Sequence, residues 1–126
     1  MMVTAESDRK DYLTQLSNGS TTIYSDTTPD KGGGGDCFRP HDLLCAGFAS
    51  CLNITIRMVL DRMNLQYEKV ITKVDLNRDV PENTTFLYDI EIIGDIDDAT
   101  KREVISKALN CPVRKTLSRQ IGFQQS

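Results

Sequence analysis

The stretch from residue 40 to residue 60 limits more than any other feature how this chain can fold. Pro40 is favoured in the first turn of a helix, and apolar side chains then recur at spacings of three and four residues. Other apolar residues fill the remaining faces, so the predicted helix is apolar almost all round for about four turns. Such a helix must be covered on every side. A sheet of the same chain covers one side, and we expect a second copy of the chain to cover the other.

This apolar stretch is not expected to span a membrane, because polar side chains interrupt it. Between residues 43 and 60 these are Cys45, Ser50, Asn53, Thr55 and Arg57. The first eight residues lack the basic and apolar segments of a signal peptide, so a cytoplasmic protein is expected. A formal net charge of −3 offers no basic field for nucleic acid or for a membrane surface.

The elements before the helix are predicted to be short strands. The 126 residues suit one domain, with residues 1–9 expected to be a flexible terminus and residues 10–126 the folded part. Two strands are predicted between Lys10 and Asp26, joined by a turn at Asn18-Gly19, a pair that accepts the positive φ values of a tight turn. Residues 27–36 contain four consecutive glycines and are interpreted either as a linker or as a mobile flap over a pocket.

The elements after the helix complete an α+β pattern. Alternating apolar residues predict strands at residues 70–76 and 86–93, connected by a loop at residues 78–84. A helix is expected over residues 99–109, capped by Asp97 or Asp98 and ended by Asn110 in the left-handed conformation. Cys111-Pro112 starts another helix, and residues 121–123 are expected to add a last short strand. This order predicts an α+β fold built from antiparallel hairpins.

Four cysteines carry most of the chemical information in the sequence, and they are expected to be thiols at rest. None forms a CxxC pair and His41 is the only histidine, so a metal site is not expected. Cys51 lies among apolar neighbours, where a cysteine is commonly a small buried core residue. Cys111 precedes a helix start, where free N–H groups and the helix dipole stabilise a thiolate.

The spacing of the cysteines limits which pairs can form a disulfide. Cys45 and Cys51 are six residues apart on one predicted helix, or about 9 Å along its axis. A disulfide needs Cα atoms within about 7 Å, so Cys45 is interpreted as a packing residue. Cys111 is a plausible partner for Cys51 because it lies on another element. Cys37, in the glycine-rich loop, is a weaker candidate.

Two segments of the chain resemble motifs of the OsmC/Ohr family. Residues 39–52, RPHDLLCAGFASCL, resemble its central-helix motif, in which a proline, an acidic residue and small residues precede Ala-x-Cys. Asn110-Cys111-Pro112-Val113 resembles its second motif, Cys-Pro-Val, and the spacing of the two motifs also agrees. The resemblance covers residues 10–123. It implies an intertwined homodimer with a long central helix packed by antiparallel sheets, and two active sites at the subunit interface.

The resemblance also implies a cysteine-based peroxidase that reduces organic hydroperoxides. Cys51 matches the peroxidatic cysteine, which becomes a sulfenic acid. Cys111 matches the resolving cysteine, which condenses with that sulfenic acid to a disulfide. A dithiol reductant then restores both thiols, and the family needs no metal, haem or flavin cofactor.

Family members also have an acidic residue and an arginine that support the peroxidatic cysteine. The acidic residue lies nine or ten positions before the peroxidatic cysteine, where this chain has Asp42, which could serve, and His41, which would be a substitution. Residues 12–36 contain no arginine, so Arg39 is the nearest candidate for the cation, ahead of Arg9 and Lys31. A positive charge is needed because burial alone raises the pKa of a cysteine.

A non-catalytic protein with the same fold is the alternative interpretation. Its dimer interface would bind a small apolar ligand, with Phe38, Phe48, Met58 and Tyr88 as candidate lining residues. Phe38 and Phe48 are also the candidate contacts for an organic hydroperoxide. Met and aromatic residues at these spacings are more commonly plain core.

Overall fold

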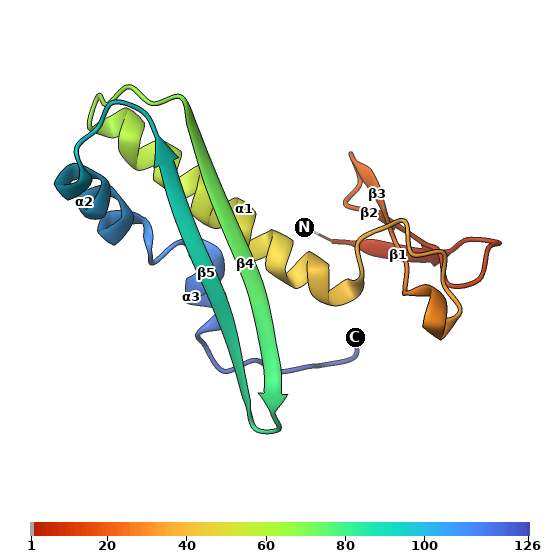
Figure 1. The fold of residues 1–126 in the computed structure, drawn as a ribbon. Helices are drawn as coiled ribbons and strands as arrows, with labels where there is room; N and C mark the ends of the chain where they lie inside the picture. Colours follow the sequence, from red (N-terminus) through yellow and green to blue (C-terminus); the bar gives the residue numbers. More distant parts are fainter. Residues whose placement is uncertain (1) are drawn as a thin grey trace. The chain divides into compact units, whose positions relative to one another are not determined.

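The computed structural model describes residues 2–126, which form two compact units (Figure 1). The first unit ends at Leu44, and the second spans Cys45–Ser126. In chain order the elements are β1 (Thr4–Ser7), β2 (Thr14–Ser17), β3 (Thr22–Ser25), the 3-10 helix η1 (Pro29–Lys31), α1 (Pro40–Arg62), β4 (Lys69–Val80), β5 (Asn83–Ile93), α2 (Asp98–Ala108) and α3 (Pro112–Leu117).

The first unit contains an antiparallel sheet in the order β1-β2-β3. The predicted turn at Asn18-Gly19 is confirmed, because the Asn18 carboxamide oxygen accepts hydrogen bonds from the backbone N–H groups of Ser20 and Thr21. The prediction of a flexible terminus over residues 1–9 is wrong for residues 4–7, which form β1. Every side chain of β1 is exposed. Backbone pairing with β2 orders this strand, and a hydrophobic pattern does not reveal pairing of that kind.

The glycine-rich segment is folded around one buried carboxylate. Asp26 is 7% exposed, and its side chain accepts hydrogen bonds from the backbone N–H groups of Thr27 at 2.7 Å and Gly34 at 2.9 Å. A Cβ atom at Gly33 would collide with the carbonyl group of Thr27. The glycines therefore permit a tight loop. The linker and flap interpretations both overlooked Asp26 as the residue that holds it.

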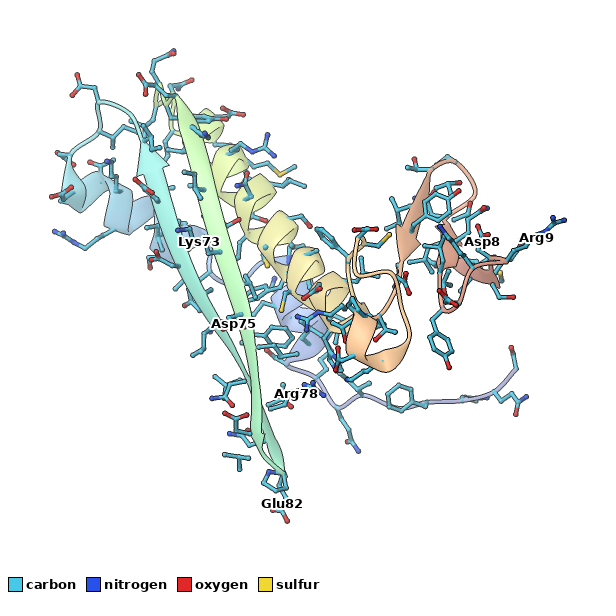
Figure 2. All side chains as sticks on the ribbon, turned by 45° about the vertical axis from the view of Figure 1, so that its right-hand side comes forward. Asp8, Arg9, Lys73, Asp75, Arg78 and Glu82 are labelled. Atoms are coloured by element: carbon cyan, nitrogen blue, oxygen red, sulfur yellow. The ribbon has the colours of Figure 1, made fainter. Side chains whose placement is uncertain are left out.

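The second unit contains a long hairpin of β4 and β5, the two helices α2 and α3, and most of α1. The predicted strands are confirmed, but the loop expected at residues 78–84 is mostly strand. Only Pro81 and Glu82 separate β4 from β5. Charged side chains, including Lys73, Asp75, Arg78 and Glu82, follow β4 to the hairpin tip (Figure 2). This end of the hairpin has few apolar residues, so alternation of apolar side chains does not predict its strands.

The caps of α2 and α3 agree with most of the sequence predictions. Asp97 caps α2 and accepts a hydrogen bond from the Thr100 N–H at 2.7 Å, and Cys111 is the N-cap residue of α3. Asn110 is not in the left-handed conformation, since Asp11 and Asn64 are the only non-glycine residues with positive φ among residues 2–126. Residues 121–123 do not form the strand that was expected there. Phe123 there is 96% exposed and pairs with no sheet.

The core of the second unit lies between α1, the hairpin and α2. Ile56, Val59 and Leu60 of α1 pack against Val70 of β4, Ile92 of β5, and Val104 and Ala108 of α2. Ile54 and Met58, also on α1, are 45% and 51% exposed. The sheet of the same chain therefore covers one side of the apolar helix, as predicted, and leaves apolar side chains open on another.

By length and composition alone, α1 is able to cross a membrane. An 18-residue window of it reaches a mean hydropathy of 1.8, and 28% of that window is buried. The expectation that the polar residues make this helix too polar to span a membrane is therefore wrong. Asn53, one of those residues, has a packing role instead, because its side chain donates a hydrogen bond to the Val70 carbonyl group of β4 at 2.9 Å.

Candidate active site

Cys51 lies on the part of α1 that is hydrogen-bonded to β4. The Thr72 hydroxyl group donates to the carbonyl oxygen of Ala49 at 2.8 Å. The Asn53 amide donates to the carbonyl oxygen of Val70 at 2.9 Å. Ala49 and Asn53 flank Cys51 by two residues on either side, so these two bonds fix the turn of α1 that carries the thiol.

Cys111 is held inside the second unit by the start of α3. It has the extended backbone of an N-cap residue, and Pro112 follows at the first helical position. Its side chain is 1% exposed and packs with Phe48 and Leu52, which are 3% and 0% exposed. Such complete burial was not evident from the sequence, because an N-cap residue is commonly at the surface.

The structure brings Cys51 and Cys111 together. Cys51 packs against the cluster of Phe48, Leu52 and Cys111, and its Sγ atom accepts a hydrogen bond from the Val113 N–H at 3.4 Å. That N–H group lies in the first turn of α3, where backbone donors have no partner within the helix. The two thiols therefore meet between the middle of α1 and the start of α3.

Burial and the neighbouring thiol set the protonation of Cys111. Burial raises the pKa of Cys111 above its ordinary value, and the adjacent Cys51 raises it further. The nearby backbone N–H groups of Arg114 and Val113 partly oppose this rise in pKa. Cys111 is therefore a protonated thiol at neutral pH.

Phe48, which packs with Cys111, contacts aromatic rings of a second element. Phe48 of α1 contacts Phe86 and Tyr88 of β5 edge to face, with ring centroids 5.7 and 5.9 Å apart. Phe48, predicted to contact substrate or ligand, is thus a packed core residue with 3% exposure. Phe38, the other predicted contact, belongs to the first unit and is 56% exposed.

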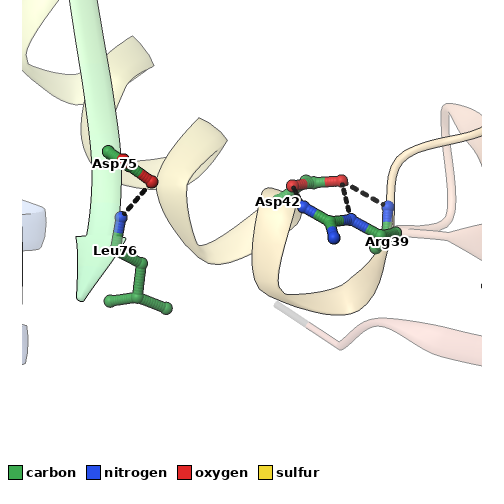
Figure 3. Close-up of polar contacts among 4 residues, drawn as sticks. All are labelled: Arg39, Asp42, Asp75 and Leu76. Atoms are coloured by element: carbon green, nitrogen blue, oxygen red, sulfur yellow. Dashed lines mark hydrogen bonds and ion pairs between the residues drawn. The ribbon is translucent and has the colours of Figure 1, made fainter. Parts of the chain in front are cut away.

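Arg39 and Asp42, the two predicted supporting residues, pair with each other in the first unit (Figure 3). The Arg39 guanidinium donates from Nε and Nη2 to the two carboxylate oxygens of Asp42, each at 2.9 Å. The Arg39 backbone N–H donates to the same carboxylate at 2.9 Å. These contacts lower the pKa of Asp42 to about 2. Asp42 therefore caps the start of α1 and orients Arg39.

Arg114, three residues after Cys111, is a cation that the sequence interpretation missed. Its guanidinium carbon lies 5.8 Å from the centre of the Tyr88 ring, and its Nη1 donates to the Leu109 carbonyl oxygen at 3.4 Å. Arg114 thus links β5, the end of α2 and the start of α3 around Cys111. The signal in the sequence that could have identified Arg114 is its position directly after the Cys-Pro-Val segment. The side chain of Arg9, an earlier candidate for the cation, points away from the three-stranded sheet (Figure 2).

The described part of the chain contains no cluster of side chains that could bind a metal ion. Among residues 2–126, no group of three or more His, Cys, Asp or Glu side chains lies close enough to hold a metal ion. All four cysteines are free thiols. In this site, Cys51 packs against the cluster that contains Cys111.

Comparison with known proteins gives a consistent family and fold. A family model described as OsmC-like protein matches residues 33–126. A comparison with curated protein sequences gives no match. Among solved structures, the OsmC-like protein of Mycoplasma pneumoniae has a TM-score of 0.73 and 18% identity, covering 92% of this chain and 85% of its own.

Two organic hydroperoxide resistance proteins have the same fold. The OsmC protein of Legionella pneumophila has a TM-score of 0.66 and 20% identity, covering 93% of this chain and 88% of its own. OhrB of Bacillus subtilis has a TM-score of 0.65 and 20% identity, covering 93% and 89%. The α+β architecture predicted from the sequence, with a long helix and antiparallel sheets, is confirmed by these likenesses.

Proposed function

This chain belongs to the OsmC-like protein family, and from that premise we propose that it reduces organic hydroperoxides with the thiols of Cys51 and Cys111. The observation that carries the proposal is the contact of the two cysteines, with the Val113 N–H donating to the Cys51 sulfur. A role in hydroperoxide resistance is supported at the level of the family by the structural relatives that bear this description.

Cys51 is the proposed nucleophile. Its thiolate attacks the distal oxygen of the hydroperoxide, the O–O bond breaks, and the alkoxide that leaves takes up a proton to become an alcohol. Cys51 is thereby oxidised to a sulfenic acid. The Val113 N–H favours this step because a hydrogen bond to an anionic sulfur is stronger than one to a neutral thiol.

Cys111 is the proposed resolving thiol. Its sulfur attacks the Cys51 sulfenic acid, the S–O bond breaks, and water leaves as the Cys51–Cys111 disulfide forms. A dithiol reductant returns both residues to thiols and becomes a disulfide itself. No atom of a metal or organic cofactor takes part in these steps.

Arg39, Asp42 and a second copy of the chain are the proposed supporting parts. Asp42 is proposed because it can fill the family's acidic position, and Arg39 because it is the nearest candidate cation, with Asp42 orienting the guanidinium. The apolar side chains of Ile54 and Met58, exposed on α1, support a homodimer in which a second copy covers them. A cytoplasmic location remains part of the proposal.

Peroxide consumption by cysteine variants tests this function. With cumene hydroperoxide and a dithiol reductant, Cys51→Ser is expected to abolish turnover, whereas Cys111→Ser consumes one equivalent and stops with a sulfenic acid on Cys51. Cys45→Ser is the matched control and retains turnover. Unchanged consumption by Cys51→Ser would leave the alternative, a non-catalytic protein that binds an apolar ligand at its dimer interface.

A further inference from the structure

We propose that a thiol reductant opens the Cys51–Cys111 disulfide by attacking the sulfur of Cys51, so that Cys111 is the leaving thiol. This inference rests on the function proposed above and names the atom at which the reductant acts. It follows from the unequal burial of the two cysteines and from the geometry of thiol–disulfide exchange.

The two sulfurs differ in access. Cys111 is 1% exposed and packs with Phe48 and Leu52, which are themselves buried. Cys51 is partly exposed. The burial of Cys111 arises within one chain, from its packing with Phe48 and Leu52.

The geometry of exchange makes this difference decisive. An attacking thiolate approaches along the extension of the S–S bond, from the side opposite the sulfur that leaves. Attack on Cys111 needs an approach to a residue that is 1% exposed and packs with Phe48 and Leu52. Attack on Cys51 needs an approach to a residue that is partly exposed. The choice of sulfur in exchange depends on access as well as on the leaving thiol.

The step balances with a dithiol as the reductant. The reductant thiolate forms a bond to the Cys51 sulfur, the Cys51–Cys111 bond breaks, and its electron pair stays on Cys111, which then takes up a proton. The second thiol of the reductant attacks the mixed disulfide at the reductant sulfur and releases Cys51. The N–H groups of Arg114 and Val113, which lie near Cys111, stabilise the leaving thiolate.

The leaving-group effect works against this direction, and access outweighs it. Burial raises the pKa of Cys111, and a thiol of higher pKa leaves more slowly. Attack on the alternative sulfur nevertheless requires the cluster around Cys111 to unpack first. We therefore expect a slow but selective reduction at Cys51.

Trapping of the mixed disulfide tests the inference. A variant with Cys37→Ser and Cys45→Ser leaves only the proposed pair, which is oxidised in one sample by cumene hydroperoxide and in another by diamide. Excess glutathione is then added for milliseconds to seconds, the reaction is quenched with acid, free thiols are alkylated, and peptides are mapped by mass. At the shortest times, glutathione is expected on Cys51 at least tenfold more than on Cys111.

Three results overturn the inference or separate it from the proposed function. Glutathione found mainly on Cys111, or equally on both cysteines, would overturn the inference. A disulfide formed by diamide but not by the hydroperoxide would refute the peroxidase, while the diamide sample still reports which sulfur is attacked. If neither oxidant forms the disulfide, both proposals fail.

Discussion

The pairing of Asp42 with Arg39 makes a prediction about stability that depends on pH. A carboxyl group whose pKa falls from its ordinary 3.8 to about 2 on folding would stabilise a buried site by about 2 kcal/mol at neutral pH. The side chains of Arg39 and Asp42 are 55% and 38% exposed, and exposed pairs contribute about 0.2–1 kcal/mol. Asp42→Asn is therefore expected to lower the free energy of unfolding by about 0.5–1 kcal/mol at pH 7.

The sign of the pH dependence follows from the lowered pKa of Asp42. The carboxylate stabilises the fold above the pKa of the unfolded chain, near 3.8, and this contribution disappears as the pH falls through about 2. The asparagine variant keeps an oxygen that accepts from the Arg39 N–H, so the difference between the proteins reports the charge. The two free energies should converge between pH 4 and about 2.

Chemical denaturation at fixed protein concentration measures both proteins across this range. Asp89→Asn, on β5, is the matched control and should follow the wild type at each pH. A difference between wild type and Asp42→Asn that stays constant down to pH 2, or that is absent at pH 7, would refute the assigned role of the Arg39 pair.

Three further predictions concern the cysteine site. Leu52→Ala is expected to cost about 2–5 kcal/mol because Leu52 is fully buried, whereas Leu87→Ala, 51% exposed, should cost far less in the same denaturation assay. Because burial raises the pKa of Cys111 above its ordinary 9.0, disulfide formation after a peroxide pulse should still accelerate as the pH rises through 9.0, and a plateau reached below that pH in stopped flow would contradict this. Arg114→Met should slow disulfide formation severalfold and leave sulfenic acid formation unchanged, with partial recovery in Arg114→Lys; equal slowing of both steps would contradict a positioning role.

The sequence predicted the elements whose signals are periodic. The all-round apolar helix and the alternating residues of the hairpin identified α1, β4 and β5 because burial imposes those periods. β1 and the outer half of the hairpin were missed because their residues are exposed and are held by backbone pairing. The glycine-rich loop was misread since its order depends on one carboxylate, Asp26, that sequence spacing does not connect to Gly34.

The candidate site was predictable in part. The motifs around Cys51 and Cys111 indicated the pair, and the structure places these cysteines in one cluster. Spacing along the chain could not reveal that Cys111 is almost fully buried, because that burial depends on Phe48 and Leu52 of another helix. It also could not reveal that Arg114 stacks on Tyr88, a contact between distant segments.

Peptide mapping after a single hydroperoxide pulse is the most direct test of the account. One equivalent of cumene hydroperoxide, added to the reduced protein without a reductant, is expected to yield a disulfide between Cys51 and Cys111 and one equivalent of cumyl alcohol. Cys37 and Cys45 should remain alkylatable throughout. Oxidation that spares Cys51, or a disulfide that joins Cys51 to Cys37 or Cys45 instead, would contradict the account.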